Sequence, residues 1–294
     1  MARHLLADRA RRDVALAAAL CAVALGALCG CSARAAPSSA DGLPAGVRAM
    51  IVQQRSDVAT RQAQVRIVNG SDQTLRVGDV RVEDARFEGA AKRVVERSST
   101  LPPGARVDVR VQLPPARCPA EDAEPVVVLE LGDDGHEARA IADDPFGFLG
   151  PLHERECLAE ALRRAAVVEF TGFEPSAPGE PATLELTITP TDDAEAVVSA
   201  VQETNLLAFG SAAEDGAFPV DVSVDANDTT PVVRRLPLVP FRCDPHAVQE
   251  DKRGTVFDVR VEVGGNSGEI ELFVGDRMRS RILSWVARWC GFGQ

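Results

Sequence analysis

An internal repeat constrains the fold of this 294-residue chain more than any other sequence feature. Residues 61–89 and 181–210 both read as an alternating strand, a polar turn and a second apolar run that ends in a phenylalanine close to a glycine. Each copy continues through a run that ends in cysteine, at Cys118 or Cys243, into a hairpin pattern with a Gly-rich turn and then a helical pattern. A shared order of this kind indicates one structural unit used twice.

The repeated unit reads as β-rich. "VDVRV" at 107–111 and "FDVRVEV" at 257–263 alternate apolar and polar residues, as half-buried strands do. The dipeptide Asn69-Gly70 lies between two such runs and predicts a hairpin, because a type I′ turn needs positive φ. Short strands with regular turn signals predict a mainly β fold of two tandem immunoglobulin-like β-sandwich domains, over 47–163 and 164–294. We expect each domain to end in a short helix.

The N-terminal segment has the pattern of an export signal. Four arginines lie within the first 12 residues, and residues 14–30, "VALAAALCAVALGALCG", carry no charge. A basic start, an apolar stretch and small residues before a break are typical of a secretory signal peptide, which we assign to 1–30. The apolar stretch is shorter than the roughly 20 residues of a stable membrane span, although an uncleaved N-terminal anchor is the alternative.

The end of this segment, Leu28-Cys29-Gly30-Cys31, resembles the bacterial lipobox, which has an aliphatic residue and two small residues before a cysteine. The resemblance implies that Cys31 is lipidated and becomes the new N-terminus; ordinary cleavage after 33–35 is the alternative. Residues 31–46 are rich in Ser, Ala, Pro and Gly and predict a flexible, lipid-anchored tether. The whole chain resembles secreted lipoproteins of GC-rich Gram-positive bacteria, whose function is uncharacterised and which imply no ligand.

Four cysteines follow the predicted signal and tether. An even number in an exported protein favours disulfides, and four cysteines allow three pairings. If the two units are copies, each forms a disulfide between its own two cysteines, which predicts the pairs Cys118–Cys157 and Cys243–Cys290. Each disulfide then links a terminal helix to the loop that precedes the last hairpin.

The segment "LVPFRCDPHAVQEDKRGT", 238–255, offers a competing interpretation. Cys243 and His246 form a C-x-x-H pattern that suits a metal site or a Cys–His nucleophile, as in an envelope hydrolase or metal-dependent enzyme. The other histidines, His136 and His153, show no second paired spacing, and a disulfide removes the free thiol. We therefore expect no catalytic residue, no metal and no cofactor, and we predict a ligand-contact loop with the residues His246, Lys252 and Arg253.

The formal net charge of −12 bears on the partners. An acidic surface is a poor match for nucleic acid, where affinity comes from neutralised phosphates, and for an anionic membrane surface. The basic segment 276–289 places Met278, Ile282, either Trp285 or Val286, and Trp289 on one helical face, which we expect to pack on the second domain. We expect a non-enzymatic binding or scaffolding module on the outer face of the cytoplasmic membrane. It would be held there by its N-terminal lipid, with a cell-envelope protein or wall polymer as partner.

Overall fold

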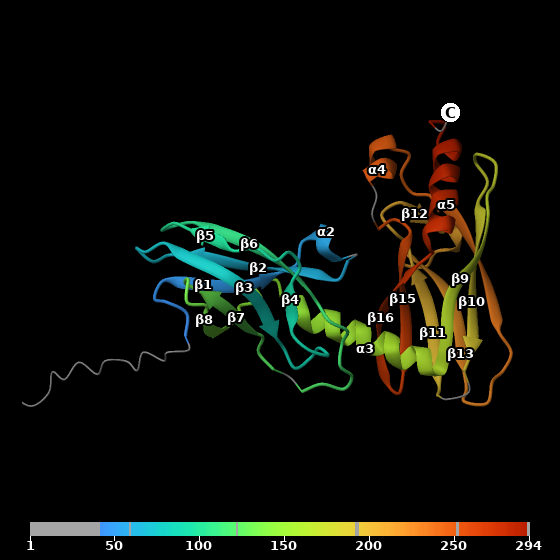
Figure 1. Ribbon diagram of the computed structural model, residues 1–294. Coiled ribbons are helices and arrows are strands. Elements are labelled where there is room, and N and C mark those ends of the chain that lie inside the picture. The colour runs from blue at the N-terminus through green and yellow to red at the C-terminus, as the bar shows by residue number, and fades with distance from the viewer. Residues whose placement is uncertain (1–41, 59, 122, 192–193, 251–252, 293–294) are drawn as a thin grey trace, which may run out of the picture. The chain divides into compact units, whose positions relative to one another are not determined.

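The computed structural model describes residues 42–292 except positions 59, 122, 192–193 and 251–252 (Figure 1). Two predicted site residues, Cys31 and Lys252, lie outside the described residues. The last residues of the predicted tether do not extend freely, because Leu43 packs against the first core and Val47 N–H donates to the Pro44 carbonyl.

The first domain contains β-strands, one short helix and the start of a long helix. They are β1 (Val47–Val52), α2 (Arg55–Val58), β2 (Gln62–Asn69), β3 (Leu75–Glu83), β4 (Ala91–Arg93), β5 (Ser99–Leu101), β6 (Arg106–Gln112), β7 (Val126–Leu131), β8 (His136–Ile141) and α3 (Leu149–Ala165). Strands β1, β2 and β6 pair in that order, and so do β3, β7 and β8. Short β4 pairs with both β3 and β6, so the two groups form one sheet that folds over a shared core.

The second domain has two separate four-stranded sheets around its own core. Its elements are β9 (Ala166–Glu174), β10 (Ala182–Pro190), β11 (Ala196–Gln202), β12 (Leu207–Ala208), η1 (Gly210–Ala212), β13 (Ala217–Val224), β14 (Val232–Pro240), α4 (Pro245–Glu250), β15 (Val256–Val263), β16 (Asn266–Phe273) and α5 (Asp276–Trp289). One sheet has the order β12-β14-β10-β9 and the other β13-β11-β15-β16.

Strand pairing supports the internal repeat. The series β1-β2-β6 of the first domain recurs as β9-β10-β14, and the series β3-β7-β8 recurs as β11-β15-β16. Of these six main strands in each domain, the first, second and fourth share one layer and the remaining three share the other, as in immunoglobulin-like sandwiches. The two copies differ between the third and fourth of these strands, where the first has the three-residue strands β4 and β5 and the second has the two-residue β12 and the eight-residue β13. The predicted fold class is confirmed.

Alternation along the strands fills each core. In β15 the side chains of Phe257, Val259 and Val261 are buried, while those between them face outward. The Phe257 ring lies 5.1 Å, centroid to centroid, from the ring of Phe170 on β9 in the opposite sheet. This contact joins the two layers directly, which is the role of an inward-facing aromatic in a sandwich.

The helix α3 departs from the expected boundary at 163. Its N-terminal residues Leu149 and Leu152 belong to the first core, whereas Leu158, Leu162 and Ala165 belong to the second. The helix therefore serves both domains, and β9 follows it directly at Ala166. Helix α5 behaves as expected, because Ile282, Trp285 and Val286 are buried in the second core.

The hairpin predicted at Asn69-Gly70 was wrong. Strand β2 pairs with β1 and β6, and not with β3, so this dipeptide carries the chain from one layer to the other. The side chain of Asn69 is buried, and its Nδ2 donates to the carbonyls of Gln73 and Leu101. Gly70 is needed for space: a Cβ there would lie 2.6 Å from the Gly46 carbonyl oxygen.

We expect Gly70→Ala to destabilise the first domain by about 1–3 kcal/mol, because backbone atoms must shift to admit the methyl group. Urea unfolding followed by circular dichroism measures the loss. Gly150→Ala in α3 is the matched control, since a Cβ there meets nothing within 4 Å, and it should leave the midpoint unchanged or slightly raised. Equal midpoints for the two variants would contradict this account of Gly70.

Candidate functional site

The predicted ligand-contact loop contains a disulfide. Cys243 is bonded to Cys290, with the Cα atoms 5.2 Å apart, so the loop after β14 is tied to the end of α5. This is the pairing that the repeat predicted. It also removes the thiol that a Cys243–His246 nucleophile or metal site requires.

The backbone of His246 makes a local contact at the start of α4. Its N–H donates to Asp244 Oδ1 at 3.0 Å, so Asp244 satisfies an unpaired donor in the first turn of α4. The imidazole of His246 is exposed. The Cys-Asp-Pro-His motif thus divides into a disulfide cysteine, a helix-capping acid, a proline at the helix start and a solvent-facing ring.

Arg253 of the same loop forms an ion pair on the surface of the last hairpin. Its guanidinium lies 2.8 Å from Glu271 on β16, and Arg155 of α3 reaches the same carboxylate oxygen at 3.1 Å. Across the strand pair, Asp258 lies directly opposite Glu271. Burial, and then the charge of Glu271, raise the pKa of the Asp258 carboxyl above its ordinary value. The positive charge of Arg253 therefore offsets the negative charges of Glu271 and Asp258 on this hairpin.

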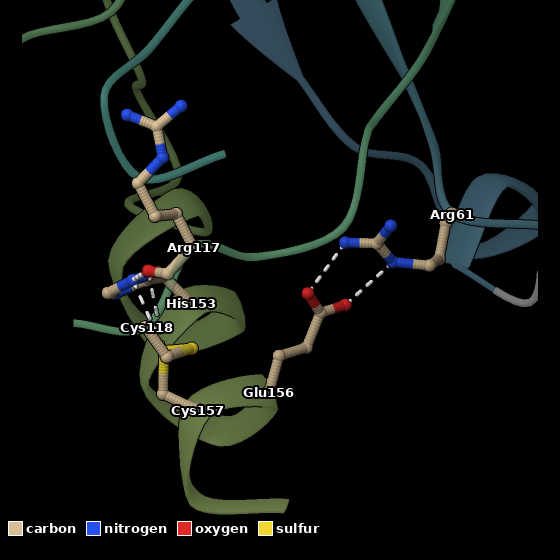
Figure 2. Close-up of a disulfide and its surroundings, with 6 residues drawn as sticks. All are labelled: Arg61, Arg117, Cys118, His153, Glu156 and Cys157. Carbon is tan, nitrogen blue, oxygen red and sulfur yellow. Dashed lines mark hydrogen bonds and ion pairs between the residues drawn. A yellow bond between two sulfur atoms is a disulfide. The ribbon is translucent and has the colours of Figure 1, made fainter. Parts of the chain in front are cut away.

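The first domain holds the second disulfide of the predicted pair, and its surroundings differ. Cys118, in the loop between β6 and β7, is bonded to Cys157 of α3 (Figure 2). His153 lies one helical turn before Cys157, and its Nε2 is 3.3 Å from Cys157 Sγ. The same nitrogen is 2.9 Å from the Arg117 carbonyl oxygen, to which it donates as the Nε2–H tautomer.

A bidentate ion pair holds α3 beside this cluster. Glu156 accepts from Arg61 Nε at 2.7 Å and from Arg61 Nη2 at 2.6 Å, and Figure 2 shows both contacts. Arg61 also donates to the carbonyl of Leu113, at the end of β6. The two side chains are about one-third or less exposed, where a fork of this geometry is stronger than a simple surface pair.

The position of His153 beside a cysteine pair was not predicted from the sequence. "HEREC", 153–157, spaces a histidine and a cysteine four apart, and helical residues at that spacing share one face. The statement that His153 has no paired spacing was therefore wrong. Within the described residues, Cys118, His153 and Cys157 are the group of metal-type donors whose ligand atoms all lie within 4.8 Å of one another.

The described residues contain no helix that is long and apolar enough to cross a membrane. Cys31 and the predicted signal peptide fall outside those residues, so lipidation stays a prediction.

No protein-family model and no curated protein matches the chain. Among solved structures, the CsuC–CsuE chaperone–tip adhesion subunit pre-assembly complex of Acinetobacter baumannii is 9% identical, over 72% of this chain and 91% of that chain, with a TM-score of 0.19. The YadV chaperone is 15% identical over 77% and 97%, with a TM-score of 0.21. Red sea bream transglutaminase is 10% identical over 78% and 31%, with a TM-score of 0.22. At scores this low no likeness supports an inference about activity, and the fold assignment rests on the strand pairing described above.

Proposed function

We propose that this protein is a lipid-anchored extracytoplasmic module that binds or scaffolds other components of a bacterial cell envelope and catalyses no reaction. The observation that carries the proposal is the pair of disulfides, one in each domain. Disulfides form and persist in oxidising compartments and are rare in the cytosol. A chain that closes both of its domains in this way fits a location outside the cytoplasmic membrane.

The N-terminal sequence supports the same location. A basic, then apolar, segment that ends in Leu28-Cys29-Gly30-Cys31 suits export followed by lipidation at Cys31. A chain with a net charge of −12 gains nothing from an anionic bilayer surface. Stable attachment then depends on the acyl chains, and more than one chain is needed for it.

The bonding state of the cysteines favours a binding role over catalysis. All four cysteines of the described residues are in disulfides, so none of them is a free thiolate nucleophile. Immunoglobulin-like sandwiches present loops on a rigid framework, which suits recognition of an envelope protein or a wall polymer. Nucleic acid is a poor partner for so acidic a chain.

Cys31→Ala tests the anchor. We expect the wild-type chain to sediment with membranes and to carry diacylglycerol on its N-terminal cysteine, while Cys31→Ala moves to the soluble exported fraction. Cys29→Ala is the matched control, because Cys29 leaves with the signal peptide, and it should stay on the membrane. Retention of Cys31→Ala on membranes would favour an uncleaved helical anchor, and a soluble wild-type chain would favour ordinary cleavage.

The released Cys31→Ala chain also provides a soluble probe for the binding role. Saturable binding to one purified envelope fraction, unchanged by His246→Ala, supports a specific partner that does not use the C-x-x-H motif. Absence of binding to every protein and polymer fraction of the envelope would contradict the proposed role.

A further inference from the structure

Three donor side chains converge beside α3. Cys118 comes from the loop after β6, and His153 and Cys157 come from consecutive turns of the helix, as Figure 2 shows. Their ligand atoms all lie within 4.8 Å of one another, and each of the three residues is partly exposed. An ion from solvent can therefore reach them without unfolding the domain.

We propose that, once this disulfide is reduced, the first domain binds one Zn²⁺ through Cys118 Sγ, Cys157 Sγ and His153 Nε2, with water as the fourth ligand. Two thiolates and an imidazole are a standard donor set for tetrahedral zinc. With Zn–S and Zn–N distances of about 2.3 and 2.1 Å, a tetrahedral ion separates its sulfur and nitrogen ligands by about 3.6 Å. The Cys157 Sγ to His153 Nε2 distance is already 3.3 Å.

The site keeps its scaffold when the disulfide is broken. The fork between Arg61 and Glu156 fixes the middle of α3 to the loop that joins α2 to β2. Leu149 and Leu152 hold the N-terminal part of the helix in the first core. Only the sulfur atoms have to separate, to about 3.8 Å on a tetrahedral zinc ion, which rotation about the two cysteine side chains supplies.

The disulfide is converted into the zinc site by a two-electron reduction, followed by replacement of the thiol protons with the ion. A dithiol reductant donates two electrons and two protons, breaks the Cys118–Cys157 bond and is itself oxidised to a disulfide. Zinc then displaces the two thiol protons, since thiolates are the ligands. The proton on His153 moves from Nε2 to Nδ1, so the ion replaces the hydrogen bond to the Arg117 carbonyl. A disulfide oxidant reverses the sequence and releases the ion.

The second domain provides an internal control. Cys243 and Cys290 are also a cysteine pair, but Cys290 Sγ has the Arg242 carbonyl at 4.0 Å as its contact, and the ring of His246 is exposed. In the part of the chain that the structure describes, the three-donor geometry occurs at the first disulfide and not at the second. The proposal therefore predicts one zinc site per chain, and not one per disulfide.

The test uses the full-length chain, reduced anaerobically with a phosphine and desalted. Zinc is titrated against a chromophoric chelator, and Co²⁺ is used as the spectroscopic probe. We expect one ion per reduced chain, with tetrahedral Co²⁺ bands and thiolate charge transfer, and no binding by the oxidised chain. His153→Ala should weaken binding at least about tenfold, whereas His246→Ala and the double variant Cys243→Ser/Cys290→Ser should bind as the wild type does.

Folding of each variant is checked by circular dichroism, and His153→Gln serves as a second, more conservative removal of the ligand. Unchanged zinc affinity in both His153 variants would overturn the proposal, because two thiols alone would then account for binding. Two ions per chain, or no ion in the reduced wild type, would overturn it as well. None of these outcomes affects the proposed lipid anchor, which is read out by membrane fractionation.

Discussion

Replacing Trp285 with alanine is expected to destabilise the second domain by about 3–5 kcal/mol. Trp285 is 1% exposed and lies in the middle of α5. Its ring and that of Phe173 on β9 form a T-shaped pair with centroids 5.6 Å apart, and its Nε1 lies 3.3 Å from Ser176 Oγ. Truncation leaves a cavity in the core, while Cys290 and the hydrogen bond from Arg281 to the Phe173 carbonyl still hold the helix in place.

The matched control for Trp285 lies one turn further on. Trp289 is partly exposed and donates from Nε1 to the Glu180 carbonyl at 3.1 Å, so Trp289→Ala should cost only about 1 kcal/mol. The chain has two tryptophans, so in each variant the remaining indole reports on α5 by fluorescence during urea unfolding. Equal losses in the two variants would show that α5 is attached along its length and not by one buried ring.

Replacing both cysteines of one disulfide with serine is expected to cost about 4 kcal/mol in the chain-entropy model, for either disulfide. The bonded residues are separated by 39 positions in the first domain and by 47 in the second. Because the entropy of loop closure depends on the logarithm of loop length, the two losses should differ by only about 0.2 kcal/mol from this cause.

The measurement compares Cys118→Ser/Cys157→Ser with Cys243→Ser/Cys290→Ser by urea unfolding, with the two domain transitions fitted separately. Each pair of substitutions should shift the transition of its own domain. A loss below about 1 kcal/mol would show that the unfolded chain already keeps those cysteines close together, since the model assumes an unstructured loop.

Much of the architecture follows from local sequence pattern. The alternation in 257–263 is enough to predict a strand that is buried on one face, and β15 has that burial. The disulfide pairing followed from a comparison of the two copies and not from any single motif. Once Cys118 and Cys243 are recognised as equivalent, closure within each copy leaves one pairing. The prediction that the apolar face of α5 packs on the second domain was also correct. Apolar residues three or four apart form one face of a helix, and a helix of this kind packs on a core by that face.

The features that were missed depend on contacts between segments distant in sequence. Asn69-Gly70 satisfies the local rule for a hairpin, but Gly70 lies against Gly46 and the strands on either side of it enter different layers. Helix α3 divides its apolar residues between two cores, which no periodicity reveals. The position of His153 beside the first disulfide depends on Cys118, which the fold brings to α3, although the spacing of His153 to Cys157 is visible in the sequence.

The two disulfides also determine how the chain would carry a mechanical load. A chain pulled from both ends cannot extend the residues between two bonded cysteines. At about 3.4 Å per extended residue, the first ring withholds about 130 Å of contour length and the second about 160 Å. The first ring contains β7, β8 and the N-terminal half of α3, and the second contains α4, β15, β16 and α5. Tension that enters through an N-terminal anchor would bypass these hairpins and helices, so stretching would open the earlier strands of each domain and leave the last third of each one closed.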